Sequence, residues 1–376
     1  MFSIGIIGVG HMGQVHLRAF QALSDVNVVA ISARSAARLR QVGEEFGVSA
    51  RYTDYREMLL QPGLDAVAVC TPTASHAEIT LAAARAAKHV LCEKPMAVSY
   101  LDAVAMVREC ARAGVNLAVC SGRARAGIYP VVGDITQARV SVDELGQLFY
   151  AKVSGPWRFR GRPGIDVLKK AAWYREARSG GGGVLMDLGV YSLDLLQYMT
   201  GDLEPVAVSA AVFQGVGGGH SAFGYDVEEH AALLLRSSAG WVATVELANA
   251  SHIGRDDAFS LVLCGTRGTL RLRSRAFGSA ATLSVSSAVA STALLPDDSA
   301  RRDLPGLRTC TVDLPPPSID MFAEFVTSCL ERRAPLMSGD AGLRVMQIVR
   351  LAYLSAAAGR ETEFGELLDP ARTGDT

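Results

Sequence analysis

The sequence predicts an α/β protein, with a doubly wound parallel sheet at its N-terminus and a second, α+β domain built on a large, mostly antiparallel open sheet. Up to about residue 122, short apolar runs alternate with helical segments, which is typical of parallel strands joined by right-handed crossovers. Beyond that point, strand-like runs follow one another with few helices between them. A length of 376 residues suits two cores. We therefore predict domains at residues 1–122 and 123–376, with a C-terminal helix at about 340–358 that could return to the first domain.

Composition and charge narrow the kinds of partner. A net charge of −1 and a pI of about 6.7 provide no basic field for nucleic acid. No uninterrupted apolar run reaches the length of about 18 residues that suggests a membrane span, and the first residues lack the pattern of an export signal. The seven cysteines show no metal-binding spacing and suit free thiols in a reducing compartment. We therefore expect a cytoplasmic protein that binds a small molecule, with no metal, nucleic acid or membrane as partner.

The first glycine-rich motif lies between a strand and a helix. The apolar strand Ile4–Ile7 is followed by Gly8-Val9-Gly10-His11-Met12-Gly13 and then by a helical pattern, which is the G-x-G-x-x-G fingerprint of a Rossmann domain in its proper context. Gly8 permits a tight turn, Gly10 lets the backbone approach a pyrophosphate, and Gly13 lets the helix pack on the strand. The phosphates would lie at the helix N-terminus. The alternative is a purely structural glycine turn.

The second strand, at residues 26–32, ends without the acid that would bind a free ribose 2′-hydroxyl. The chain reads Ile31-Ser32-Ala33-Arg34-Ser35 at this point. Arg34 and Ser35 could hold a 2′-phosphate, and Arg38 lies one turn into the next helix. The sequence therefore favours NADP, with NAD as the second choice. The alternative is that both arginines are ordinary surface charges.

Two further strands end in residues that carry chemistry. The strand 64–70 is followed by Thr71-Pro72-Thr73, and the apolar run from Val90 ends abruptly in Glu93-Lys94-Pro95. Ligands of open α/β sheets bind at the carboxyl edge, where a partly desolvated lysine can have its pKa lowered toward the range of a general acid or base. Lys94 is therefore a candidate catalytic residue, but this segment taken alone favours the other interpretation. The alternative is that Glu93 and Lys94 form a solvated turn pair.

The remaining elements follow from periodicity. In the first domain we expect helices at about 38–46, 54–60, 75–87 and 102–113 and a last strand at 115–120. In the second we expect strands at 148–154, 206–213, 229–235, 241–248, 259–264 and 269–273, of which the last two form a hairpin through Gly265–Gly268. Residues 274–310, rich in Ser, Ala and Arg, are expected to be an irregular excursion of the sheet. Helices at about 319–332 and 340–358 complete the fold.

A second glycine-rich stretch, Gly180–Gly183, leads into a predicted helix. Asp187, Tyr191 and Asp194 share one face of this helix at i, i+4 and i+7, while four leucines supply its packing face: Leu185, Leu188, Leu195 and Leu196. A phenol is a usable proton donor or acceptor if a nearby cation such as Lys94 lowers its pKa from about 10. The alternative is a hydrogen-bonded helix face that packs against a sheet.

These motifs together resemble the Gfo/Idh/MocA family of glucose-fructose oxidoreductases and inositol dehydrogenases. The resemblance rests on the fingerprint at Gly8–Gly13, on Cys70-Thr71-Pro72-Thr73 with His76, on Glu93-Lys94-Pro95, and on Gly181-Gly182-Gly183 with Asp187, Gly189 and Tyr191. Gly265-Thr266-Arg267-Gly268-Thr269-Leu270 and the closing helix extend it over essentially the whole chain, except residues 274–310.

The resemblance implies a nucleotide-binding domain, a second domain whose open sheet often joins subunits as a homodimer or homotetramer, and a catalytic Lys94 beside the nicotinamide. Many members carry a histidine at the position of Tyr191, so this chain is more similar to the branch in which tyrosine is taken as the acid/base, including glucose-fructose oxidoreductase, dimeric dihydrodiol dehydrogenase and certain sugar ketoreductases. The expected cofactor contacts are Gly8, Gly10, His11, Met12, Gly13, Arg34, Ser35, Arg38, Thr71, Pro72, His76, Glu93 and Lys94. The expected substrate contacts are Arg123, Trp173, Tyr174, Asp187 and Tyr191.

The resulting hypothesis is an NADP(H)-dependent oxidoreductase that acts on a secondary alcohol or ketone of a sugar, polyol or related ring. Tyr191 would exchange the hydroxyl proton, Lys94 would stabilise the oxyanion, and Asp187 would orient the substrate. Two alternatives remain open. One is a non-catalytic dinucleotide-binding regulator on the same fold, and the other is a glycosidase or epimerase that recycles a bound nicotinamide.

Overall fold

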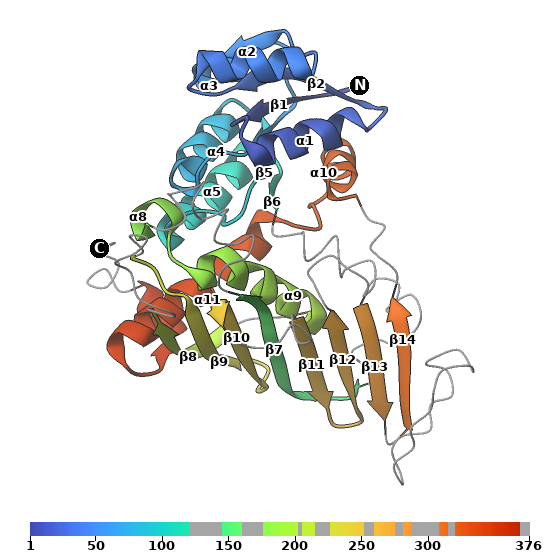
Figure 1. The fold of residues 1–376 in the computed structure, drawn as a ribbon, viewed down its shortest axis with the longest axis vertical. Coiled ribbons are helices and arrows are strands. Elements are labelled where there is room, and N and C mark those ends of the chain that lie inside the picture. Colours follow the sequence, from blue (N-terminus) through green and yellow to red (C-terminus); the bar gives the residue numbers. More distant parts are fainter. Residues whose placement is uncertain are drawn as a thin grey trace. The chain divides into compact units, whose positions relative to one another are not determined.

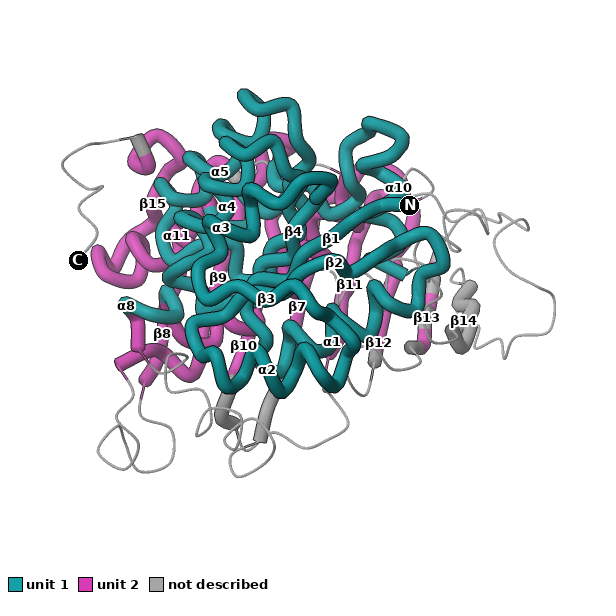
Figure 2. The backbone as a smooth tube through the Cα atoms, turned by 90° about the horizontal axis from the view of Figure 1, so that it is seen from above, with its two compact units in different colours: residues 1–121, 178–181, 320–346 teal, residues 122–177, 182–319, 347–376 magenta. Residues whose placement is uncertain are grey.

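The computed structural model describes residues 1–120, 145–159, 176–201, 205–214, 226–251, 259–274, 281–287, 308–314 and 320–368. The chain divides into two compact units, and neither is one continuous stretch of sequence (Figure 2). Unit 1 comprises Met1–Ser121, Arg178–Gly181 and Asp320–Met346, and unit 2 comprises Gly122–Ala177, Gly182–Ile319 and Gln347–Thr376. Among the described helices, none combines the length and the apolar character needed to cross a membrane.

The sheet of unit 1 is parallel throughout, as predicted. Its strands lie in the order β3-β2-β1-β4-β5-β6, of which β1, β2, β5 and β6 are labelled in Figure 1. They are β1 (Phe2–Ile7), β2 (Val26–Ser32), β3 (Ala50–Tyr52), β4 (Ala66–Val69), β5 (His89–Cys92) and β6 (Leu117–Val119). The direction of winding reverses between β1 and β4, and such a reversal is where doubly wound sheets bind ligands at their carboxyl edge. The short β3 was not predicted, because three residues carry too little periodicity.

Helices connect these strands close to the predicted positions. They are α1 (His11–Gln21), α2 (Ala36–Glu45), α3 (Tyr55–Leu59), α4 (His76–Arg85) and α5 (Tyr100–Ala113), with a 3-10 turn at Thr73–Ser75 before α4. Ser35, Asp54 and Ser99 cap α2, α3 and α5, since each side chain accepts a hydrogen bond from a backbone N–H of the first turn. These caps explain where three of the helices begin.

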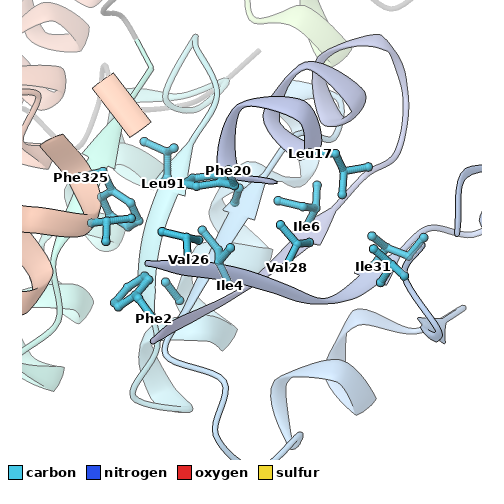
Figure 3. Close-up of a cluster of buried hydrophobic side chains, with 14 of the residues drawn as sticks. Phe2, Ile4, Ile6, Leu17, Phe20, Val26, Val28, Ile31, Leu91 and Phe325 are labelled. Carbon is cyan, nitrogen blue, oxygen red and sulfur yellow. The ribbon is translucent and has the colours of Figure 1, made fainter. Parts of the chain in front are cut away.

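A segment from near the C-terminus completes the core of unit 1. Helix α10 (Met321–Leu330) follows the capping residue Asp320 and packs on α1. Figure 3 shows Phe325 beside the apolar side chains of β1, β2 and α1, and Phe325 is fully buried. The ring of Phe322 packs edge-on against Phe20, with 5.0 Å between the ring centroids. Burial of one such side chain stabilises the folded state by about 1.5–3 kcal/mol. Helix α10 therefore contributes to the stability of the core of unit 1.

Unit 2 contains a nine-stranded sheet in the order β14-β13-β12-β11-β7-β10-β9-β8-β15 (Figure 1). Its strands are β7 (Leu148–Phe159), β8 (Pro205–Phe213), β9 (His230–Ser237), β10 (Val242–Ser251), β11 (Phe259–Gly265), β12 (Gly268–Ser274), β13 (Ala281–Ser287), β14 (Arg308–Leu314) and β15 (Thr362–Glu363). Among the strand pairs of this sheet that the structure describes, only β7 with β10 is parallel. The mostly antiparallel sheet and the hairpin of β11 and β12 are therefore confirmed.

One expectation in this unit was wrong. Within residues 274–310, expected to be irregular, β13 forms a regular strand and β14 begins, and the two pair with each other over seven residues. In β13 the apolar positions Leu283 and Val285 alternate with Ser and Thr. Because serine and alanine are weak strand formers, this period-two pattern was hidden by composition.

Unit 2 also contains helical segments that contact its sheet. A π-helical turn at Leu185–Gly189 continues into α9 (Val190–Thr200), which contacts β7. The short α8 (Ala177–Gly180) precedes the π turn and belongs mostly to unit 1, and α11 (Gly339–Ala358) runs from unit 1 into unit 2. The chain then adds β15 and a 3-10 helix at Phe364–Leu368, neither of which was predicted.

Candidate active site

The three fingerprint glycines lie at the start of α1 and have different steric surroundings. Gly8 has a φ of +93°, and a Cβ there would lie 2.7 Å from the carbonyl oxygen of Cys70. A Cβ on Gly13 would lie 1.9 Å from the carbonyl oxygen of Gly8. Gly10 is exposed, and a Cβ there would meet no described atom within 4 Å. Gly8 and Gly13 therefore serve the fold, whereas Gly10 leaves room for a ligand.

The N-terminus of α1 suits an anion. Gly10 is its N-cap, no side chain among the described residues caps it, and the first turn holds no acidic residue. Backbone N–H groups and the helix dipole make such an end favourable for phosphate. The loop of Gly8–Gly13 therefore fits the pyrophosphate of a dinucleotide, and the exposed His11 and the half-buried Met12 begin the helix at that point.

The residues after β2 lie at the surface. Arg34 and Ser35 are exposed, and the Oγ of Ser35 accepts a hydrogen bond from the backbone N–H of Arg38 at 3.3 Å. The guanidinium of Arg38 donates to the side-chain oxygen of Gln41 at 2.9 Å. Arg34 is therefore the exposed cation next to the N-terminus of α2, where a 2′-phosphate would be expected.

The loop after β4 is braced by its own side chains. The hydroxyl of Ser75 donates toward the Oγ1 of Thr71 at 2.8 Å and the carbonyl of Pro72 at 2.9 Å. His76 follows as the first residue of α4 and is buried. Its Nε2 lies 2.8 Å from the carbonyl oxygen of Thr71, and its Nδ1 lies 2.9 Å from the carbonyl oxygen of Pro95. A direct contact of His76 with the cofactor stays a prediction.

Lys94 lies two residues beyond the last residue of β5, at the carboxyl edge of the parallel sheet as predicted. It is half-buried, and its peptide bond to Pro95 is cis. The preceding Glu93 is buried and uses both carboxylate oxygens. Oε1 accepts from Nε2 of His16 at 2.9 Å, and Oε2 accepts from the backbone N–H of Lys94 at 3.1 Å. The interpretation of Glu93 and Lys94 as a solvated turn pair is therefore wrong.

Opposing effects set the pKa of Glu93. Burial raises it, but the hydrogen bond from His16, the charges of His16 and Lys94 and the Lys94 N–H outweigh burial, so the pKa lies below its ordinary value. At neutral pH Glu93 is therefore a carboxylate with two fixed partners.

The glycine run of unit 2 allows close packing. A Cβ on Gly182 would lie 2.0 Å from the hydroxyl oxygen of Tyr353, and one on Gly183 would lie 1.9 Å from the carbonyl oxygen of Glu228. The carboxylate of Glu228 accepts hydrogen bonds from the backbone N–H of Gly183 at 2.8 Å and of Leu185 at 2.9 Å, and from the hydroxyl of Tyr353 at 2.9 Å. This buried carboxylate therefore holds the beginning of the helical segment.

Burial is the main influence on the ionisation of both Glu228 and Tyr353. It raises the pKa of Glu228, while the backbone N–H donors and the hydroxyl of Tyr353 oppose it. It also raises the pKa of Tyr353, and the negative charge of Glu228 adds to that shift. The Tyr353 hydroxyl therefore stays protonated and remains a donor.

The predicted helix face of Asp187, Tyr191 and Asp194 is corrected in its first turn. Residues Leu185–Gly189 are π-helical rather than α-helical, so the i, i+4 rule does not carry over to Asp187. The carboxylate of Glu228 accepts hydrogen bonds from the N–H groups of Gly183 and Leu185 at the start of this segment. The periodicity of the sequence does not reveal such a tertiary contact. Asp187 is half-buried, whereas Tyr191 and Asp194 are buried. The packing prediction holds, because Leu185, Leu188, Leu195 and Leu196 are all buried.

The predicted site residues belong to different units. Lys94 and all the expected cofactor contacts lie in unit 1, and Asp187 and Tyr191 lie in unit 2. Arg123, Trp173 and Tyr174 lie outside the described residues. The sequence analysis did not predict His16, Glu228 or Tyr353. His16 could have been noticed because it is a polar residue beside the apolar Leu17 and one turn before Phe20 on α1.

Two family models match the chain. One describes an oxidoreductase family with an NAD-binding Rossmann fold (GFO_IDH_MocA) and matches residues 2–121. The other describes a GFO/IDH/MocA C-terminal domain and matches residues 136–271. The two matches together cover the predicted nucleotide-binding region and the greater part of the larger sheet.

Relatives extend the similarity along the chain. The D-apiose dehydrogenase of Paraburkholderia graminis is 28% identical over 97% of this chain and 90% of its own length. The myo-inositol 2-dehydrogenase of Thermotoga maritima is 26% identical over 71% of this chain and 74% of its own length. The aldose-aldose oxidoreductase of Caulobacter crescentus, solved with glycerol, covers 96% of this chain and 99% of its own with a TM-score of 0.76 at 24% identity, so it shares the fold.

Proposed function

Because the chain belongs to the Gfo/Idh/MocA family of oxidoreductases, we propose that it transfers hydride reversibly between NADP(H) and a secondary alcohol or ketone of a sugar, polyol or related ring. The observation that carries the proposal is the carboxyl edge of the parallel sheet. There, the open position of Gly10 leads to the start of α1, which no described side chain caps, and Lys94 follows β5 on a loop held by the buried contacts of His16 with Glu93 and of His76 with Pro95. Two relatives named for apiose and myo-inositol support the substrate class.

The residues divide the work as follows. The loop at Gly8–Gly13 and the first turn of α1 hold the pyrophosphate. When bound, the nicotinamide supplies the hydride acceptor or donor. Tyr191 takes the substrate hydroxyl proton during oxidation and returns it during reduction, and Asp187 orients that hydroxyl. The ammonium group of Lys94 stabilises negative charge on the reacting oxygen and on the phenolate.

The choice of NADP rests on the end of β2. Arg34 is exposed beside the N-terminus of α2, and the segment Ala33–Ser35 contains no carboxylate that would repel a 2′-phosphate. An arginine and a helix N-terminus are both suited to phosphate recognition. NADP is therefore proposed over NAD.

The experiment is a panel of sugars, inositols, keto-sugars and dicarbonyls, followed at the nicotinamide absorbance with each cofactor. We expect turnover of a polyhydroxylated substrate with a higher kcat/KM for NADPH than for NADH. Tyr191→Phe and Lys94→Ala should each lower kcat by about 10² or more, the scale of general acid–base catalysis. Tyr198→Phe, on the same helix, is the matched control with wild-type turnover expected.

The outcomes separate the parts of the proposal. No turnover by the wild type with any substrate class would overturn the redox function. Turnover that prefers NADH would overturn only the NADP assignment, and unchanged kcat in Tyr191→Phe would remove Tyr191 from its role.

A further inference from the structure

We infer that two buried histidines, His16 and His76, act as positioning residues that fix the Lys94 loop from two helices. The inference rests on the proposed function, in which Lys94 is the catalytic cation. Neither histidine has an exposed side chain, and neither is placed among the reacting groups. Each is linked to a residue adjacent to Lys94 in the sequence, namely Glu93 or Pro95.

His16 acts through Glu93. Its Nε2 and the Oε1 of Glu93 are 2.9 Å apart in a buried pair, and the other carboxylate oxygen accepts the backbone N–H of Lys94. Nδ1 of His16 is buried with no hydrogen-bond partner among the described residues, and Nε2 carries the proton that it donates to the Glu93 carboxylate. The ring packs edge-on against Phe322 at 4.9 Å between centroids, which fixes its orientation. A side chain of helix α1 thus fixes the position of Glu93, the residue before Lys94.

His76 acts through Pro95. Its two ring nitrogens lie within hydrogen-bond distance of the carbonyl oxygens of Pro95, on the loop after β5, and of Thr71, on the loop after β4. The neutral imidazole donates to one of these oxygens, and the imidazolium donates to both. Burial lowers the pKa of His76, while the two carbonyl acceptors and the charge of Glu93 oppose that shift. Helix α4 thus controls the residue after Lys94.

The two histidines reach the Lys94 loop from opposite faces of the sheet. The crossover from β1 to β2 and the crossover from β4 to β5 run in opposite directions along the strand order, so right-handed connections place α1 and α4 on opposite faces. Each helix also begins at a loop expected to hold the cofactor, at Gly10 for α1 and after Thr71–Pro72 for α4. A shift of either loop would therefore move the Lys94 backbone.

Energetics favour a positioning role over a purely stabilising one. Burying a polar pair costs desolvation, and apolar residues of similar volume are often equally or more stabilising at such sites. The histidines add directional contacts. Hydrogen bonds fix the position of the Lys94 loop, whereas apolar contacts would bury the loop without fixing its position. A misplacement of about 1 Å near the reacting centre can cost about 10² in rate.

The test compares two substitutions of His16. Gln places a side-chain N–H close to the position of Nε2, whereas Leu fills the site without a donor. We expect His16→Leu to lower kcat by about 10- to 10²-fold and His16→Gln to restore most of it. Val48→Ala, which truncates a buried core residue elsewhere in unit 1, is the control for lost stability and should leave kcat unchanged at a temperature where it is folded. His76→Leu should lower kcat in the same way as His16→Leu.

A second readout does not depend on turnover. Acetic anhydride labelling of Lys94, measured by mass spectrometry against Lys152 as internal reference, reports whether NADPH shields the ammonium group. We expect strong protection by NADPH in the wild type and in His16→Gln, and several-fold weaker protection in His16→Leu.

Each result has a definite meaning. Wild-type kcat and protection in His16→Leu, or an equal kcat loss in Val48→Ala, would overturn the role of His16, and an unaffected His76→Leu would overturn the role of His76. A wild type without turnover and without NADPH protection would overturn the proposed function, and the inference with it. A wild type that turns over while the histidine variants match it overturns the inference alone.

Discussion

Gly10 and Gly13 are three residues apart at the start of α1, and only Gly13 is required by the packing of the protein itself. A Cβ at position 13 would collide with the backbone of Gly8, whereas position 10 is open and has a φ of −69° that any residue can adopt. A side chain at position 13 would therefore disrupt the packing of α1 on β1. A side chain at position 10 would affect only a ligand that binds at this loop.

This difference predicts opposite phenotypes for the two alanine variants. Gly10→Ala should leave the thermal unfolding midpoint close to wild type but weaken NADPH binding, because the methyl group occupies space needed by the pyrophosphate. Gly13→Ala should lower the unfolding midpoint even without cofactor. Calorimetry and fluorescence titration of both variants measure these effects. A large loss of stability in Gly10→Ala would contradict the open surroundings of Gly10.

At the residue scale, the sequence predicted groups whose role follows from local geometry. The glycine fingerprint and the position of Lys94 after a buried strand depend on neighbours in the chain, and both were found. His16 and Glu228 were missed because their partners lie 77 and 43–45 residues away along the chain. A buried polar side chain becomes meaningful only when the group that satisfies it is known.

At the element scale, the most consequential helix is α10. It lies far along the sequence from β1 and α1 but supplies Phe325, Val326 and Cys329 to their core. The periodicity predicted the helix at nearly the right residues, but not the unit that it completes.

We therefore expect Phe325→Ala to destabilise unit 1 by about 3–5 kcal/mol, the usual cost of truncating a buried phenylalanine. Leu330→Ala is the matched control on the same helix, because Leu330 is 63% exposed and its truncation should cost no more than about 0.5 kcal/mol. Urea unfolding followed by circular dichroism measures both changes. Equal effects of the two substitutions would contradict the assignment of α10 to the core.

Elements that were missed or misread share a cause. β3 and β15 are three and two residues long, and β13 alternates leucine and valine with serine and threonine in a region dominated by small residues. The π turn before α9 is set by Glu228 and Tyr353, which are distant in sequence. Strand pairing and tertiary hydrogen bonds decide these elements, and neither is encoded in a local period.

At the scale of the whole molecule, the chain crosses between its two units several times. The parallel sheet of unit 1 is formed by the N-terminal part of the chain, and residues 178–181 and 320–346 also belong to unit 1. The proposed cation belongs to unit 1, and the proposed acid/base belongs to unit 2. The proposed reaction therefore requires that Lys94 and Tyr191 both act at one nicotinamide.

The most direct test is a crystal structure of the protein with NADP⁺ and the substrate that the panel identifies. We predict that the Lys94 Nζ and the Tyr191 Oη both lie within hydrogen-bond reach, about 2.6–3.2 Å, of the reacting oxygen. A complex in which the substrate oxygen contacts neither group, or in which the two side chains lie at separate surfaces, would contradict the account.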